Sequence, residues 1–296
     1  MFDLRYHVTS LAAVFIALVI GILVGVALAS HGLGNTERKS LEDDLRRAQK
    51  TADRLRTDLD SAQQSGAASK QFVEDTYNAL MTDRLKGKRI AVLFLGSVDH
   101  RIQNDISTMI KDAGGRSAVR TYAVQVPINE PSLDKRLANR PALAKYSGSD
   151  QLRNLGRQLG REFVAGDETP LWNALHDLIV QEATPRFGAS RRAADGVIVV
   201  RTADPQTGES APFVKGLYEG LADGGVPAAG VAESTSDFGA KKVFGQAQLS
   251  TVDDIDLPPG KLALAIVLSE PASPADYGVN ADDLLPPVTP VLTPSG

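Results

Sequence analysis

The side chains that could bind a transition metal are few and scattered in this chain of 296 residues. It has no cysteine. Soft ions prefer Cys and Met, whereas borderline divalent ions prefer clustered imidazoles, and neither set occurs locally. We therefore predict no metal site. The histidines are His7, His31, His100 and His176, and the methionines are Met1, Met81 and Met109.

The histidines are better explained by packing. His7 and His31 flank a long apolar run, where an amphipathic ring suits each membrane interface. His176 follows Trp172 by one helical turn on an amphipathic stretch. We expect it to be half-buried rather than catalytic.

Nucleotide binding and acyl transfer need patterns that this sequence does not match. The loop Gly96-Ser97-Val98-Asp99-His100 follows a predicted strand but lacks the further glycines of a dinucleotide fingerprint and the GK[ST] of a phosphate loop. Asp99 is expected to be a helix N-cap. No G-x-S-x-G sequence is present. We predict no catalytic or cofactor-binding residue, and a nucleotide or sugar site at Gly96 to Asp99 remains a third possibility.

Composition excludes one further class. The net charge is −4 and the pI is about 5.6, without any basic run interleaved with aromatic residues, so we expect no nucleic-acid partner.

The elements that organise the chain begin with an uncharged run from Val8 to Ser30. As a helix it would extend about 35 Å, enough to cross a hydrocarbon core of about 30 Å. We predict a transmembrane anchor over residues 1–30. A cleaved signal peptide is the alternative, because Ala27-Leu28-Ala29 matches a cleavage site. Small residues recur every fourth position and predict a helix-pairing face: Ala13, Ala17, Gly21, Gly25 and Ala29.

A heptad pattern follows the anchor. Its a and d positions are Leu41, Leu45, Ala48, Ala52, Leu55, Leu59 and Ala62. We predict a coiled-coil stalk over residues 31–86, interrupted at Gly66, and a parallel homodimer formed through both helices. The alternative is an amphipathic helix folded back on its own domain. Lysines and arginines after the run slightly favour a cytoplasmic stalk, so charge alone leaves topology open.

Alternating apolar runs and amphipathic stretches predict an α/β domain over residues 87–285, with a largely parallel, Rossmann-like sheet. Residues 127–190 are predicted to be a helical insertion, and the proline-rich residues 286–296 a disordered tail. Strands are predicted at Arg89 to Leu95, Ser117 to Val126, Gly196 to Val200, Val226 to Ala232 and Lys261 to Leu268. Helices are predicted at Ile102 to Ala113, Leu152 to Phe163, Leu171 to Ile179 and Ala211 to Ala222.

The amino-terminal motif Leu4, Arg5, Tyr6, His7 and Val8, with the apolar sequence after it, resembles the actinobacterial copper transport protein B family. This family also includes the corynebacterial cell-separation protein SteB. The late Tyr277-Gly278 and Leu284-Leu285-Pro286 agree. The resemblance implies either an outer-membrane channel for copper efflux or an anchored periplasmic protein that works with a membrane partner to control cell-wall hydrolysis at division. It also implies that the domain lies outside the cytoplasmic membrane.

The residues favour the second function. They offer no copper-ligand cluster, no polar stripe to line a pore and no series of alternating segments for a transmembrane barrel. We expect a non-enzymatic, dimeric, membrane-anchored envelope protein that acts as a scaffold or regulator of cell separation, with a cell-wall hydrolase or another envelope protein as partner. Copper transport is the alternative.

Overall fold

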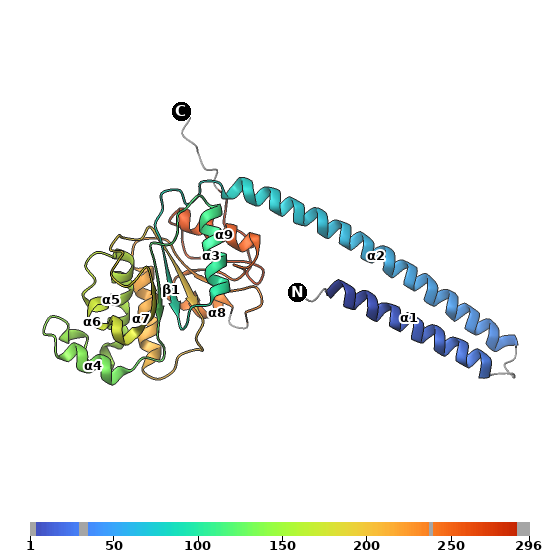
Figure 1. Cartoon of the computed structure of the whole chain (residues 1–296), viewed down its shortest axis with the longest axis horizontal. Coiled ribbons are helices and arrows are strands. Elements are labelled where there is room, and N and C mark those ends of the chain that lie inside the picture. The colour runs from blue at the N-terminus through green and yellow to red at the C-terminus, as the bar shows by residue number, and fades with distance from the viewer. Residues whose placement is uncertain (1–3, 30–34, 237–238, 289–296) are drawn as a thin grey trace, which may run out of the picture. The chain divides into compact units, whose positions relative to one another are not determined.

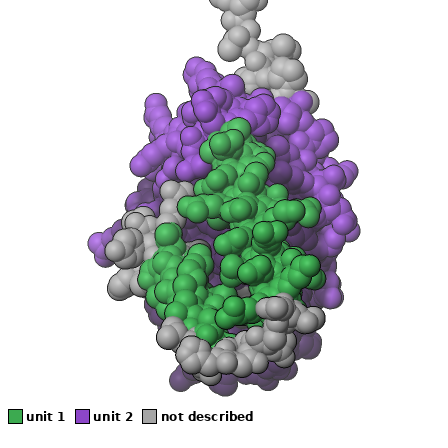
Figure 2. Space-filling model, turned by 90° about the vertical axis from the view of Figure 1, so that its right-hand side faces the viewer, with its two compact units in different colours: residues 1–69 green, residues 70–296 purple. Residues whose placement is uncertain are grey.

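The computed structural model describes residues 4–29, 35–236 and 239–288, and the chain divides into two compact units, residues 1–69 and residues 70–296. Figure 2 colours the two units separately. The first unit contains α1 (Leu4–Ala29) and most of α2 (Asn35–Met81), and the second contains the end of α2 and the α/β domain.

Helix α1 is uniformly apolar along its middle. The stretch Thr9–Ala27 is long and apolar enough to cross a membrane, and it is the one such helix in the part of the chain described. Large side chains such as Phe15 and Ile16 are exposed in the isolated chain. A lipid environment would remove this apolar surface from water.

Helix α2 extends for 47 residues, about 70 Å at 1.5 Å per residue. It passes through Gly66, which was predicted to interrupt the repeat, without a break. A single glycine lowers helix stability by only about 1 kcal/mol relative to alanine, so strong helix formers on both sides maintain the helix.

The last turns of α2 belong to the globular unit. Met81 and the following Leu85 are buried in its core, and the Tyr77 hydroxyl donates a hydrogen bond of 2.8 Å to Asp112 at the end of α3 (His100–Asp112). The two compact units therefore divide between residues 69 and 70. The sequence had placed this boundary at residue 87, where glycine ends the helical composition.

The domain is built on a seven-stranded sheet in the order β3-β2-β1-β4-β5-β6-β7. Only β3, at one edge, pairs antiparallel; all other pairings are parallel. The predicted mixed α/β class with a largely parallel sheet is confirmed. The strands are β1 (Ile90–Leu95), β2 (Arg120–Val124), β3 (Val180–Thr184), β4 (Gly196–Arg201), β5 (Ala228–Val231), β6 (Ser250–Val252) and β7 (Asp276–Tyr277).

Helices cover both faces of this sheet (Figure 1). Because successive side chains of a strand point to opposite faces, Leu93 and Leu95 of β1 pack against one helical layer, and Val92 and Phe94 pack against the other. The first layer contains α4 (Glu130–Ala138), α5 (Leu152–Ala165), α6 (Pro170–Ile179) and α7 (Ser210–Ala222), and the second contains α3 (His100–Asp112) and α9 (Pro258–Ser269). The short helix α8 (Ala240–Phe244) precedes β6.

One sequence prediction about an element was wrong. The run Lys261 to Leu268, predicted as a strand, is part of α9; an apolar run of this length has no distinguishing periodicity, and the signal of a helix start was Pro258-Pro259 at its first positions. Within the mainly helical insertion, β3 follows α6 directly. The mixed burial of β3 gave no clear strand pattern.

Helices α5 and α7 approach backbone to backbone. A Cβ atom added at Gly216 would lie 2.0 Å from the carbonyl oxygen of Arg153, and one at Gly220 would lie 2.0 Å from that of Arg157. A Cβ atom added at Gly156 of α5 would lie 2.1 Å from the carbonyl oxygen of Phe213 in α7. The predicted contact of α5 with α6 is also present, because the Trp172 indole donates to the Leu159 carbonyl at 2.8 Å. The insertion is thus packed firmly against α7.

Candidate functional site

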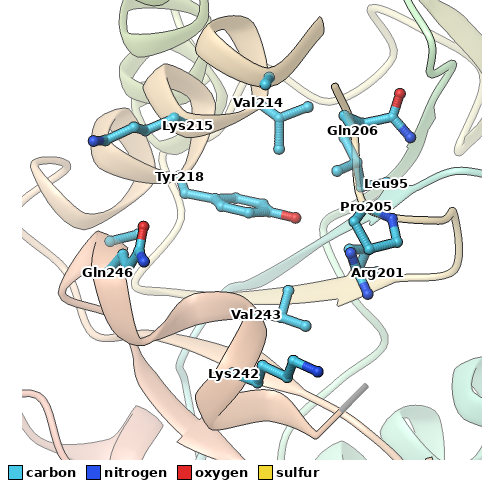
Figure 3. Close-up of a pocket in the computed structure, with 12 residues that line it drawn as sticks. Leu95, Arg201, Pro205, Gln206, Val214, Lys215, Tyr218, Lys242, Val243 and Gln246 are labelled. Atoms are coloured by element: carbon cyan, nitrogen blue, oxygen red, sulfur yellow. The ribbon is translucent and has the colours of Figure 1, made fainter. Parts of the chain in front are cut away.

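A pocket of about 500 Å³ lies at the carboxyl ends of β1 and β4, between α7 and the segment formed by α8 and the following 3-10 turn, Gly245–Ala247. The chain leaves β1 toward β2 on one side and returns to β4 on the other, so the connections diverge here. Parallel sheets bind ligands at such points, beyond the carboxyl ends of the strands. Figure 3 shows the pocket and the side chains around it.

The lining combines apolar walls with cationic and amide groups. Strand ends supply Leu95 and Arg201, the loop after β4 supplies Pro205 and Gln206, and α7 supplies Ala211, Val214, Lys215 and Tyr218. The α8 segment supplies Lys242, Val243, Gln246 and Ala247. None of these twelve residues is acidic. The pocket is therefore suited to an anion with an apolar portion.

Tyr218 extends from α7 across this pocket, and Figure 3 shows its hydroxyl directed toward the side where Arg201 and Pro205 lie. The residue is only 5% exposed, and its ring packs edge-on against Phe244 with a centroid separation of 5.2 Å. The hydroxyl has no hydrogen-bond partner among the residues described. Burial raises the pKa of Tyr218 far above its usual value, so the phenol stays protonated and able to donate.

Arg201 places a cation at the end of β4, where the buried run of the strand stops. Burial lowers the pKa of its guanidinium, and the nearby Tyr218 and Asp204 partly oppose this shift. An arginine remains charged at neutral pH even after such a shift. Its planar group matches carboxylate and phosphate oxygens.

The loop after β1, the site of the third predicted possibility, is engaged in structure. Asp99 caps α3 as predicted, and its carboxylate accepts from the backbone N–H groups of Arg101 and Ile102 at 2.8 and 3.3 Å. Gly96 has φ of +108°, and a Cβ there would lie 2.6 Å from Thr202 Oγ1. Thr202 also donates to the Ser97 carbonyl at 2.6 Å. These contacts indicate that the residues of the loop after β1 fix its conformation rather than bind a phosphate group.

The residues predicted to form the dimer interface lie on two helices and are not gathered into a pocket. Ala13, Ala17, Gly21 and Gly25 are exposed on α1, and nothing lies within 4 Å of a Cβ added at either glycine. The side chain of Ala29 and those of the motif Leu4 to Val8 lie outside the described residues. On α2 the seven heptad residues are all exposed: Leu41, Leu45, Ala48, Ala52, Leu55, Leu59 and Ala62.

The histidines do not gather. His176 is half-buried, as predicted, and stacks on Phe187 with ring centroids 4.3 Å apart. His100 faces Gln103 at 3.3 Å on the surface of α3. His31 and the side chain of His7 lie outside the residues described. Over the described ranges, no group of three or more His, Cys, Asp or Glu residues could hold a metal ion.

Sequence reasoning did not find the pocket. Its polar groups come from β4, α7 and α8, separated by up to about 40 residues and with no recurrent spacing. The one local signal was a cation, Arg201, at the end of an apolar strand.

Comparison with known proteins gives a consistent result. The model of the family described as "Copper transport outer membrane protein, MctB" matches residues 1–286. The proteins named Copper transporter MctB from Mycobacterium bovis and Mycobacterium tuberculosis are each 25% identical to this chain over 306 aligned positions, covering 91% of this chain and 93% of the relative. This confirms the resemblance carried by the amino-terminal motif: the chain belongs to the MctB family of membrane-associated copper transport proteins.

Proposed function

We propose that this chain is a non-enzymatic, dimeric, membrane-anchored envelope protein whose α/β domain acts outside the cytoplasmic membrane as a scaffold or regulator of cell separation and cell-wall hydrolysis. The observation that carries this proposal is the 47-residue helix α2 with its unpartnered apolar heptad positions. An anchor followed by a long helix and a globular domain is the set of parts that an envelope scaffold requires.

The occupant proposed for the heptad face is a second copy of the chain. Leu55 and Leu59 are 63% and 56% exposed, and Leu41 and Leu45 are 37% and 41% exposed. A parallel copy would place identical a and d residues opposite one another and remove these side chains from water. The membrane helix just before it carries its small residues every fourth position, so one parallel pair would satisfy both helices.

A binding role for the domain is supported by the chemistry of the pocket between α7 and α8. The described residues lining the pocket include no carboxylate, histidine, serine or threonine. They therefore provide no serine, threonine or carboxylate nucleophile beside a histidine or carboxylate base, a common arrangement for covalent hydrolysis. Cations, amides and a phenol are recognition groups.

Copper transport is the second candidate, and the names of the family and of its mycobacterial relatives favour it. If this chain handled copper directly, its ligands would have to come from residues outside the described ranges or from contacts between copies, since no suitable cluster occurs within those ranges. Loss of a cell-separation protein and loss of a copper transporter are expected to cause different cellular defects. They can be separated genetically.

The cellular test is deletion of the gene in its own host, scored for septation and for copper sensitivity in parallel. The proposal expects chained or incompletely separated cells with unchanged copper tolerance, restored by the intact gene. Normal separation together with copper hypersensitivity would refute the scaffold role and support the second candidate.

The molecular test addresses the dimer. The double variant Leu45→Asp with Leu55→Asp introduces charge at one a and one d position and is expected to abolish crosslinking of the region after the membrane helix, where α1 cannot contribute to pairing. The matched control, Thr57→Asp with Gln64→Asp, adds the same charge at f positions, away from the predicted seam, and should leave crosslinking intact. Persistence of crosslinking in the first variant would show that α2 is not the interface.

A further inference from the structure

We propose that the pocket between α7 and α8 binds a small organic anion, a carboxylate or phosphate group attached to an apolar or aromatic body. This site is independent of the proposed dimer, because it lies wholly within the second compact unit. Its location at the carboxyl ends of β1 and β4 is the position at which parallel sheets bind ligands.

Charge selects the ligand class. Arg201, Lys215 and Lys242 line the pocket, and none of the described lining residues is acidic. Within the described part of the chain, neither lysine forms an ion pair within 4 Å, although Lys215 interacts electrostatically with Glu219 one turn along α7. Lys241, next to Lys242, is paired with Asp276 at 3.4 Å. Asp204 acts electrostatically on Arg201 but does not line the cavity. The pocket therefore attracts anions.

The Tyr218 hydroxyl indicates where the anionic group would sit. It is buried, directed into the pocket and without a hydrogen-bond partner among the described residues (Figure 3). Buried hydroxyl groups are normally paired, and an exception calls for a missing partner. An oxygen atom of the ligand placed between Tyr218 and Arg201 would accept from both.

The remaining walls select an apolar body. Leu95, Val214 and Val243 contribute aliphatic surface beside the Tyr218 ring, and the volume of about 500 Å³ lies within the usual range of about 300–1,000 Å³ for small-molecule sites. A free inorganic ion would leave most of this volume and all of this apolar surface without contact.

The test titrates the full chain in zwitterionic nanodiscs with defined probes, followed by ligand-observed NMR. Phenyl phosphate and benzoate carry the two candidate anions, benzyl alcohol is their neutral counterpart, and inorganic phosphate lacks the apolar body. We expect phenyl phosphate or benzoate to bind with a Kd of about 1 mM or tighter. Benzyl alcohol and inorganic phosphate should each bind at least tenfold more weakly. The stronger of the two aromatic anions identifies which acid group the site prefers.

Variants tie binding to the pocket. Tyr218→Phe keeps the ring and removes only the unpartnered hydroxyl, so it should fold normally and weaken the better probe about fivefold to tenfold. Lys242→Gln should weaken it to a similar extent. Lys241→Gln is the matched control, because it removes a neighbouring charge that does not line the pocket, and it should leave the Kd within twofold of the native value. The fluorescence melting profile of Trp172 checks that each variant is folded.

Three results would overturn the proposal. The first is that benzyl alcohol binds as tightly as the anions. The second is that no anion binds at 10 mM, a concentration about ten times the expected Kd. The third is that the folded Tyr218→Phe and Lys242→Gln proteins bind the probe with unchanged affinity. Equal affinity for inorganic phosphate and phenyl phosphate would remove the apolar body from the assignment and so refute the ligand class proposed.

Discussion

The contact between α5 and α7 is expected to be highly sensitive to a single methyl group. Gly220→Ala would place a Cβ atom 2.0 Å from the carbonyl oxygen of Arg157, and Gly216→Ala would do the same against Arg153. Ordinary contacts of this kind lie at 3.4 to 4 Å. The two helices would therefore have to separate by about 1 Å or more. No flexible side chain lies between them to absorb the change.

The magnitude follows from two opposing effects. Alanine is a better helix former than glycine by about 1 kcal/mol. Overpacking a well-filled interior typically costs about 1–3 kcal/mol, occasionally more, and here the obstruction is backbone. We expect a net loss of about 2 kcal/mol for Gly220→Ala. For a domain of this size, that corresponds to a fall in Tm of roughly 4–8 °C.

The assay is thermal unfolding followed by fluorescence of Trp172, the single tryptophan, whose indole bonds to the α5 backbone at Leu159. The control is Gly66→Ala in α2, where nothing lies within 4 Å of the new Cβ. It should leave the Tm of the domain unchanged and slightly increase helicity by circular dichroism. A Tm for Gly220→Ala at or above the native value would refute the close backbone approach.

Two further predictions concern charged groups of the domain. Asp254 is fully buried with neither carboxylate oxygen hydrogen-bonded in the described chain, and burial beside Asp253 and Asp256 raises its pKa to about 7. The same group ionises near pH 4 in the unfolded chain, so between about pH 4 and pH 7 the folded state holds a proton that the unfolded state has lost. The free energy of unfolding therefore decreases as the pH rises from about 4 to 7. Asp254→Asn should reduce the difference in urea stability between pH 5 and pH 8 by roughly 2.5 kcal/mol, and an unchanged difference would contradict this. At the start of α3, Asp99→Ala should lower stability by about 1 kcal/mol, measured by urea unfolding, whereas Asp99→Asn should retain most of the cap.

The parts of the fold that the sequence predicted are those with strong local patterns. The buried strand β1 is continuously apolar, and α3 is amphipathic with an acidic cap, so both were identified from their own residues. Helix α9 was not, because its burial on nearly all sides removes the periodicity that distinguishes a helix from a strand. The short strands at the sheet edge depend on their neighbours for their hydrogen bonds.

The pocket could not be predicted for a different reason. Lys215 and Lys242 have no sequence relationship, and they come together only because α7 and α8 meet beyond the sheet. The unsatisfied hydroxyl of Tyr218 is a property of packing, which no spacing encodes.

Helix α7 contributes both to the wall of the pocket and to the contact with α5. One side presents Val214, Lys215 and Tyr218 to the pocket, and the other rests its glycines directly on the backbone of α5. A rigid contact of this kind transmits displacement rather than absorbing it. A protein that bound the insertion and shifted α5 would therefore reshape the pocket wall, and a ligand in the pocket would alter the affinity for that protein by the same factor. The contact between α5 and α7 would thus couple a ligand in the pocket to a protein bound at the insertion.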